Sequence, residues 1–284
     1  MKRSPSPLRY PGGKACIFDM TKDILVSHNL GGWQYAEPYA GGCGLALSLL
    51  FDGVVSKLHL NDIDPSIATF WEILIFHTDE LADRVENVTF TIEEWRKQKQ
   101  IQKEKLTASP IDLAFSTLYL NRTNRSGIIK AGVIGGLAQT GNYKMDCRFN
   151  KADIISKIYA IAKRQADICI YKLDAIDFIN ILESQKNLVL MIDPPYYNKG
   201  QTLYASFYRH DDHAKIANVL TNTTLPWILT YDNTSEIIEL YRNFNQYSFN
   251  INYSVANKRV GSELLITSSI FDRLTHHRLT ACLD

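Results

Sequence analysis

The sequence predicts an α/β fold, a mostly parallel β-sheet with helices on both faces. Two features of the 284-residue chain lead to this prediction. Short apolar runs alternate with helical segments, which is typical of parallel strands joined by helices. The last two apolar runs, 246–254 and 263–270, have no helix between them, so we expect them to form an antiparallel pair.

The expected elements follow one another along the chain. Strands at 33–37 and 57–60 are each followed by a helix, and the second helix begins at Pro65 because proline is favoured at the first helical position. From about residue 76 to 166 the periodicity becomes helical and polar. Alternation then resumes, with expected strands at 168–173, 187–192 and 227–231 and expected helices near 176–183, 211–221 and 234–242.

The segment 76–166 is expected to be a mainly helical insert in one discontinuous domain, which comprises residues 1–75 and 167–284. Charge distinguishes this part of the chain from the rest. Residues 91–170 hold 14 Lys and Arg against 7 Asp and Glu, whereas the other residues hold 17 against 23. This asymmetry favours a nucleic-acid-facing insert, although an exposed helical face would show the same charge.

Composition argues against several other classes of protein. Five scattered cysteines without a C-x-x-C motif indicate neither a disulfide framework nor a zinc site. No stretch reaches the roughly 18 apolar residues of a membrane span, and no apolar signal region follows the N-terminus. We therefore expect a cytoplasmic protein that binds no membrane and no metal.

A stiff corner follows the apolar run 187–192, with the sequence Asp193-Pro194-Pro195-Tyr196. Each proline fixes φ and removes a backbone N–H. The corner therefore holds a carboxylate and an aromatic ring at the carboxyl end of a strand, where ligands bind in open α/β sheets. The Asp193 carboxylate and the Pro194 carbonyl can accept both hydrogens of an exocyclic amine, while a flat base stacks on Tyr196. The alternative is a rigid corner with an incidental tyrosine.

A glycine-rich turn at 37–44 predicts a second ligand-binding feature, because glycine allows a ligand to approach the backbone closely. The phosphate-binding patterns G-x-G-x-x-G and G-K-[ST] are absent, so a nucleoside cofactor without pyrophosphate, S-adenosylmethionine, fits better. Asp62 ends the next strand, where an acid can bind ribose hydroxyls. It could instead cap the helix that begins at Pro65, a role for which Asp64 is better placed.

Five segments, in this order, resemble the Dam-type (alpha-group) N6-adenine DNA methyltransferases over most of the chain. They are 9–14, 37–44, 61–65, 121–127 and 193–196, and 259–266 is similar to the terminal strand of that family. The resemblance implies a Rossmann-like methyltransferase sheet with a C-terminal antiparallel hairpin and an inserted target-recognition subdomain. It also implies site-specific methyl transfer from S-adenosylmethionine to adenine N6 in double-stranded DNA, with base flipping.

The same resemblance implies roles for individual residues. The catalytic residues would be Asp193, Pro194 and Tyr196. The cofactor-binding residues would be Tyr10, Lys14, Glu37, Pro38, Tyr39, Gly41, Asp62, Ile63, Asp177, Phe178 and Asp193. Two of these assignments have plain alternatives, since Lys14 could be a surface lysine and Asp177-Phe178 a helix-start acid with a core phenylalanine.

The expected DNA contacts lie mainly in the polar segment 121–127. Arginine reads guanine edges and asparagine reads adenine edges, which favours a DNA-facing role over an ordinary polar loop. Lys258 and Arg259 could contact phosphate or be solvated surface charges. The DNA-binding residues would be Asn121, Arg122, Asn124, Arg125, Lys258 and Arg259.

Other activities remain as alternatives. No cysteine follows a proline, so the covalent chemistry of cytosine-C5 methylation is not indicated. A methyltransferase of the same cofactor class could act on RNA or on a protein side chain, and a non-enzymatic nucleic-acid-binding protein could retain a vestigial pocket. The resemblance also allows a companion restriction endonuclease as a partner.

Overall fold

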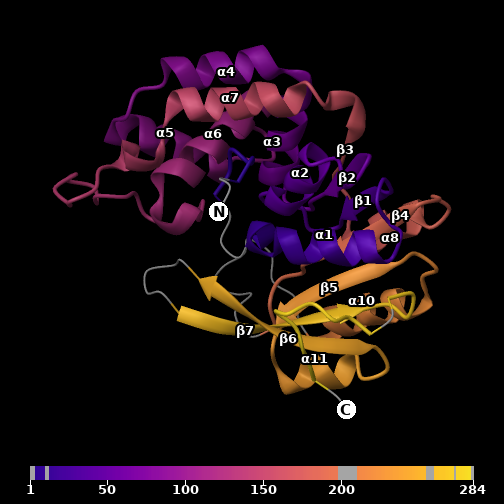
Figure 1. Ribbon diagram of the computed structural model, residues 1–284. Helices are drawn as coiled ribbons and strands as arrows, with labels where there is room; N and C mark the ends of the chain where they lie inside the picture. The colour runs from indigo at the N-terminus through magenta and orange to yellow at the C-terminus, as the bar shows by residue number, and fades with distance from the viewer. Residues whose placement is uncertain (1–3, 10–12, 198–209, 254–258, 272, 283–284) are drawn as a thin grey trace.

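The computed structural model of the protein describes residues 4–9, 13–197, 210–253, 259–271 and 273–282, with the backbone alone at 252–253 and 259–260. Its centre is an eight-stranded mixed sheet with the order β3-β2-β1-β4-β5-β7-β6-β8 (Figure 1). The strands are β1 Gln34–Glu37, β2 Lys57–Asn61, β3 Ile168–Tyr171, β4 Leu188–Ile192, β5 Trp227–Asp232, β6 Asn245–Tyr253, β7 Arg259–Thr267 and β8 Thr280–Ala281.

The sheet confirms the α/β class expected from the sequence. Neighbouring strands from β3 to β5 are all parallel, whereas β7 is antiparallel to both β5 and β6. The last two long strands therefore form the antiparallel pair that the missing helix predicted. β7 begins at Arg259, earlier than expected, because it pairs along the whole length of β6, from Tyr253↔Arg259 to Asn245↔Thr267.

Helices cover both faces of this sheet. Along β4, Leu188, Leu190 and Ile192 face one hydrophobic cluster, while Val189 and Met191 face the other. One cluster includes α8 Ala175–Leu182, α10 His210–Asn222 and α11 Ser235–Leu240. The other includes α1 Phe18–Ser27, α2 Gly44–Phe51, α3 Pro65–Phe76, α4 Thr78–Asn87, α6 Pro110–Thr123 and α7 Lys151–Ala162.

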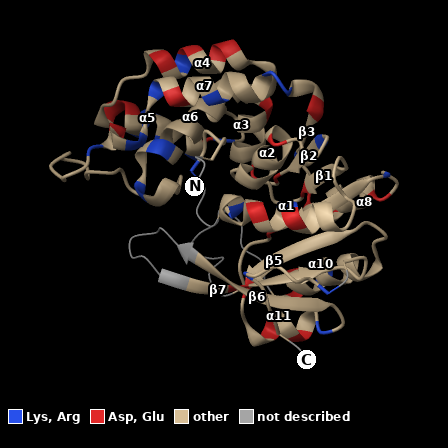
Figure 2. Cartoon of the chain, in the orientation of Figure 1, with Lys and Arg blue, Asp and Glu red and all other residues tan. Residues whose placement is uncertain are grey.

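The predicted insert is mainly helical, but it has no core of its own among the described residues. Its helices α4, α6 and α7, with α5 Ile92–Lys103 at their edge, pack against α3 and share the hydrophobic cluster of α1 and α2 (Figure 1). Charge is uneven over these helices: acids dominate α4, whereas Lys and Arg gather on α5 and after α6 (Figure 2). No described helix is long and apolar enough to cross a membrane.

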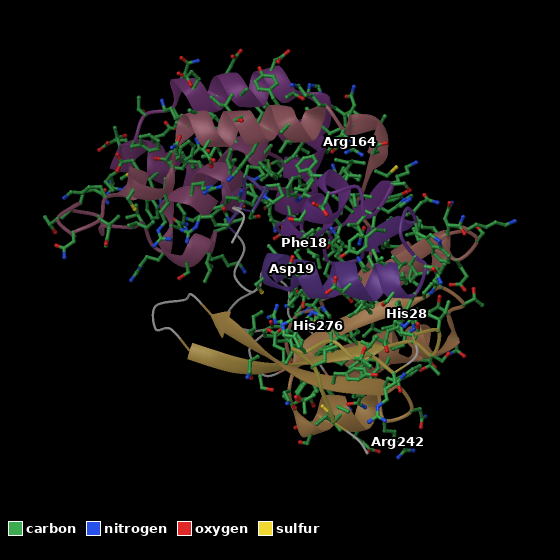
Figure 3. The ribbon with its side chains drawn as sticks, in the orientation of Figure 1. Phe18, Asp19, His28, Arg164, Arg242 and His276 are labelled. Carbon is green, nitrogen blue, oxygen red and sulfur yellow. The ribbon has the colours of Figure 1, made fainter. Side chains whose placement is uncertain are left out.

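The C-terminal segment returns to the N-terminal helix. His28 lies edge-on against Phe271, and the His276 imidazole is 3.6 Å from the Asp23 carboxylate. His28 and His276 are labelled in Figure 3. Arg278 donates to the carbonyl of Cys16 (2.9 Å), in the short 3-10 helix η1 Lys14–Ile17 that precedes α1. The C-terminal segment therefore supports the part of the chain that carries Lys14.

Candidate functional site

The candidate site lies where the sheet changes its direction of winding. β1 and β4 are neighbours, but the chain leaves β1 toward β2 on one side and leaves β4 toward β5 on the other. Such a switch point leaves a crevice outside the carboxyl ends of the strands, which is where open α/β sheets bind ligands. Glu37 ends β1 and Asp193 follows β4, so these two of the predicted site acids flank this point.

Asp193 is held by groups from two other elements. The Lys14 ammonium is 2.8 Å from its Oδ1 and 2.9 Å from its Oδ2. Thr230 on β5 donates a hydroxyl hydrogen bond to Oδ1 at 2.9 Å. The Asp193 side chain is 24% exposed whereas that of Lys14 is 5% exposed, so a ligand can reach the acid more readily than the base. Lys14 is therefore no surface lysine, and it meets the corner that begins at Asp193.

Glu263 is a site residue that the sequence did not identify. It lies on β7 opposite Asp232 of β5 and is fully buried. Its Oε2 is 3.6 Å from the Lys14 ammonium, and Tyr196 donates its hydroxyl hydrogen to Oε1. The available signal was a lone acid at the start of the apolar run Leu264-Leu265-Ile266, because carboxylates are rarely buried without a partner.

The site has more acids than bases. Among the described residues, the carboxyl groups of Asp193 and Glu263 lie close to the ammonium of Lys14, which also acts electrostatically on Glu37. Burial raises the pKa of Glu37 to about 8, opposed by the hydroxyl that Tyr35 donates to it at 3.1 Å. Burial also raises the pKa of Asp193, which Lys14 opposes and the charge of Glu263 reinforces. A cationic ligand would favour the ionised form of Asp193.

Hydrogen bonds from neighbouring residues hold the glycine-rich turn after β1. Gly41 has a positive φ of 47°, and its N–H donates to Asp62 Oδ2 at 3.0 Å. The indole of Trp71 donates to the Gly41 carbonyl at 2.9 Å, and Asn61 donates to the Pro38 carbonyl at 3.0 Å. The turn therefore has a single shape, set by the end of β2 and by α3.

Asp62 supports this turn and can still accept further hydrogen bonds. Each of its oxygens accepts one backbone N–H, from Gly41 and from Asp64 (2.9 Å), and a carboxylate has about four acceptor positions. Burial raises the pKa of Asp62 to about 6. Ile63 beside it is 53% exposed, as a residue that covers a ligand ring would be. Asp64, as expected, is the residue that caps α3, by accepting from the N–H of Ser66.

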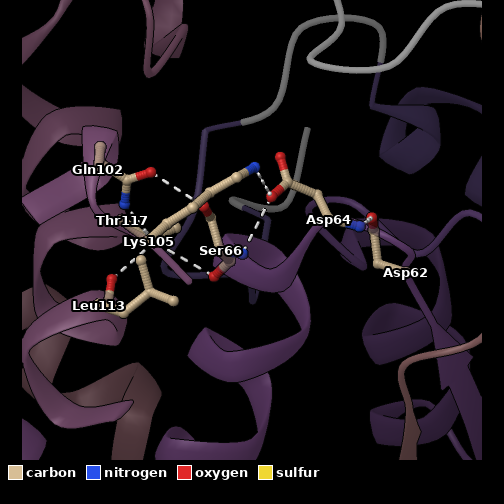
Figure 4. Close-up of polar contacts among 7 residues, drawn as sticks. All are labelled: Asp62, Asp64, Ser66, Gln102, Lys105, Leu113 and Thr117. Atoms are coloured by element: carbon tan, nitrogen blue, oxygen red, sulfur yellow. Dashed lines mark hydrogen bonds and ion pairs between the residues drawn. The ribbon is translucent and has the colours of Figure 1, made fainter. Parts of the chain in front are cut away.

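Hydrogen bonds join this edge of the sheet to the insert (Figure 4). Lys105 is 2.8 Å from Asp64 Oδ1, and Ser66 donates to Gln102 at 2.9 Å. Gln102 in turn donates to Thr117 of α6 at 3.0 Å, and the Thr117 hydroxyl is 3.2 Å from the Ser66 carbonyl. The start of α3 is therefore tied to both α5 and α6.

Two predicted cofactor residues lie on α8. Phe178 is fully buried and packs edge-on against Tyr171 with ring centres 5.1 Å apart, so its assignment to the cofactor is wrong and it is a core residue. Asp177 is exposed in the first turn of α8, where an acid is favourable next to the helix N-terminus. Tyr39 is half-buried beside the turn and packs against the same core cluster as Phe178.

Tyr196 does not offer a ring face to a base in this structure. It is 2% exposed, its hydroxyl accepts from Lys14 at 3.1 Å and donates to Glu263, and the Lys14 ammonium is 5.2 Å from its ring centre. The expected stacking of a base on Tyr196 is therefore not possible in this conformation. Tyr196 instead supports Lys14 and Glu263. Pro194 is buried next to Asp193, as a rigid corner requires.

Asn121 and Arg122 do not face DNA either. Asn121 is 2% exposed and pairs with the backbone of Arg9, accepting its N–H at 2.7 Å and donating to its carbonyl at 2.8 Å. Arg122 is 8% exposed and donates to the Pro7 carbonyl at 2.6 Å, while burial lowers its pKa to about 10. These side chains are used to hold the N-terminal segment, because α6 is the buried central helix of the insert. The same segment ends at Gly127, where a Cβ would lie 2.3 Å from the Arg9 carbonyl oxygen.

The other two predicted DNA-binding residues of 121–127 differ in burial. Asn124 is fully buried, accepts from the indole of Trp95 at 2.7 Å and donates to the carbonyls of Ile128 and Ile129, so it too is structural. Arg125, by contrast, is exposed. Other exposed basic side chains lie on α5, in the loop after α6 and in the 3-10 helix Met145–Arg148, namely Arg96, Lys97, Lys103, Lys130, Lys144 and Arg148 (Figure 2).

Three predicted site residues cannot be placed. Tyr10 and Lys258 lie outside the described residues, as does the side chain of Arg259, whose backbone begins β7. Within the described part of the chain, no group of three or more His, Cys, Asp or Glu side chains is arranged to hold a metal ion.

No protein-family model matches the sequence, and no curated protein matches it. Solved structures give distant similarity only. A precorrin 8W decarboxylase from Methanobacterium thermoautotrophicum is 10% identical, with a TM-score of 0.37 over 88% of this chain and 89% of that one. A protein from Legionella pneumophila is 11% identical, with a TM-score of 0.32 over 88% of this chain and 84% of that one. Similarity this weak does not bear on function.

Proposed function

We propose that this protein transfers a methyl group from S-adenosylmethionine to N6 of adenine in double-stranded DNA. The observation that carries the proposal is the contact between Lys14 and Asp193, which are 179 residues apart in the sequence. The two residues belong to separate motifs of the family resemblance. They meet beside Glu37 at the switch point of the sheet, where a ligand is expected.

The arrangement of the strands supports the same proposal. A doubly wound parallel sheet extended by an antiparallel pair is what the resemblance implies for a Rossmann-like methyltransferase. Here β7 enters between β5 and β6 and runs antiparallel to both. This pairing has a direct effect on the site, because it brings Glu263 of β7 next to Lys14.

The residues at the switch point fit S-adenosylmethionine. When bound, it supplies an electrophilic methyl group on a positively charged sulfur. The carboxylates of Asp193 and Glu263, which share the one ammonium of Lys14, suit such a cation. Asp62 retains acceptor positions for ribose hydroxyls, and the exposed Ile63 offers an apolar face for a nucleoside ring.

Asp193 and Pro194 would act on the amine of the target base. That amine is a poor nucleophile because its lone pair is conjugated with the ring. The Asp193 carboxylate would accept one amine hydrogen and the Pro194 carbonyl the other, which favours a tetrahedral nitrogen aimed at the methyl group. This is catalysis by positioning and by preorganised charge, with no covalent intermediate on the protein.

Support for DNA as the substrate comes from the resemblance and from the exposed basic side chains of 91–170. Arg148 is exposed next to Pro7, since Arg122 bonds to the carbonyls of both residues. Arg125 is exposed two residues before Gly127, which lies against the carbonyl of Arg9. A duplex bound there would have to present a flipped base to Asp193. The buried residues Asn121, Arg122 and Asn124 contribute nothing to this proposal.

Transfer of a labelled methyl group tests the proposed substrate class. The purified protein would be incubated with S-adenosylmethionine labelled in the methyl group and, separately, with duplex DNA, RNA and denatured protein. We expect label in duplex DNA, with far less in the other two. Label only in RNA or only in protein would mean that DNA is not the substrate. No label in any of the three would contradict the proposed activity.

A further inference from the structure

Lys14 is shared between two acids. Its ammonium is 2.8 Å from Asp193 Oδ1 and 3.6 Å from Glu263 Oε2. Tyr196 links the same groups, because its hydroxyl accepts from Lys14 at 3.1 Å and donates to Glu263. A charge-assisted network of this kind fixes the geometry of every member.

The two acids differ in burial. Glu263 lies on β7, which pairs on one side with β5 at Asp232 and on the other with β6 at Phe249. Its side chain is fully buried, whereas Asp193 follows the end of β4 and is 24% exposed. Glu263 is therefore a fixed internal charge, and Asp193 is the acid that a ligand can reach.

We propose that Glu263 is a positioning residue for Asp193. Through Lys14 and Tyr196 it holds the Asp193 carboxylate in place and takes part of the ammonium charge, so that Asp193 remains a strong acceptor. The inference rests on the proposed function for what Asp193 accepts, but the electrostatic link between the two acids does not require it.

The other ionisable groups around the pair are few among the described residues. Tyr35 and Glu37 of β1 face Asp193, while Cys16 and, across the β5–β7 pair, Asp232 lie next to Glu263. Burial raises the pKa of Asp193, Lys14 opposes the rise and Glu263 adds to it. Removing the charge of Glu263 should therefore make Asp193 easier to ionise.

The titration of Asp193 tests this link in the ligand-free protein. The full-length chain would be labelled with 13C at aspartate carboxyl groups, and Asp193→Asn would identify the signal. We expect Glu263→Gln to lower the Asp193 titration midpoint by about one pH unit, since a like charge within ~4–6 Å raises the pKa of an acid. The control is Glu239→Gln, which removes an exposed carboxylate paired with Arg242 and should leave the midpoint unchanged.

An unchanged midpoint in a folded Glu263→Gln protein would overturn the proposal. If that variant does not fold, Glu263→Asp provides the test. The shorter side chain draws the carboxylate away from Lys14 and Tyr196, so the Asp193 midpoint should still fall, and an unchanged midpoint would contradict the coupling. Because neither DNA nor S-adenosylmethionine is present, this result is separate from success or failure of methyl transfer.

Discussion

Glu37 combines a buried position with a carboxyl group whose pKa is about 8. An unfolded glutamate titrates near 4.5, so between these values the folded state holds a proton that the unfolded state has lost. Folding stability must therefore fall as pH rises through this window. The sequence placed Glu37 at the site, but its raised pKa depends on burial and on Asp193, which only the fold brings close.

We expect Glu37→Gln to remove part of this pH dependence. The wild type should lose thermal stability between pH 5 and about pH 8 more steeply than the variant, because glutamine has no proton to lose. Thermal unfolding followed by circular dichroism at several pH values measures the difference, with Glu239→Gln as the exposed control. Parallel curves for wild type and Glu37→Gln would show that Glu37 is ionised normally.

Among the helices, α6 is the one whose function was not predicted correctly from its composition. The segment 121–127 predicted DNA contacts because it is rich in Arg and Asn. Every residue from 113 to 123 is buried, however, because α6 is packed between α3 and the other insert helices. The partners of Asn121 and Arg122 are backbone groups of 7–9, far away in the sequence, and no local pattern reveals them.

Arg122 and Arg125 should therefore differ when each is replaced by alanine. Arg122→Ala loses a buried hydrogen bond to Pro7, which costs about 1–3 kcal/mol of stability, and it should lower turnover because Lys14 follows that segment. Its DNA affinity should be unchanged. Arg125→Ala should keep its stability and reduce the salt dependence of DNA binding by about one phosphate contact.

Thermal unfolding and a salt series of DNA titrations would separate these two roles. If Arg122 is a structural residue, Arg122→Ala lowers the melting temperature and leaves the DNA affinity unchanged. If Arg122→Ala instead melts like the wild type and binds DNA more weakly, the original interpretation of 121–127 as a DNA-facing segment is restored.

For the whole molecule, the sequence predicted the strands and their alternation well, because buried parallel strands appear as short apolar runs. It did not predict which helices share a core. Residues of α4, α6 and α7 join those of α1, α2 and α3 in one hydrophobic cluster, and Figure 1 shows these helices packed together. Helix periodicity identifies an apolar face but does not say against which element that face is packed.

A shared core should unfold as one unit. We expect urea unfolding to give the same midpoint for a probe in the insert, Trp95, and a probe in the sheet, Trp227, measured in single-tryptophan variants. Circular dichroism of each variant provides the control for the substitutions. Two distinct midpoints would mean that the insert folds as an independent domain.

We infer that Asp193, beside Lys14 at the switch point, accepts a hydrogen bond from the amine of adenine during methyl transfer. The most direct measurement is mass spectrometry of nucleosides from DNA of cells that express the wild type or Asp193→Ala. We predict N6-methyladenine with the wild type and a rate lower by about 10²–10³ for the purified variant, since a preorganised acceptor is lost. Methylated cytosine alone, or equal N6-methyladenine with a folded Asp193→Ala protein, would contradict the account.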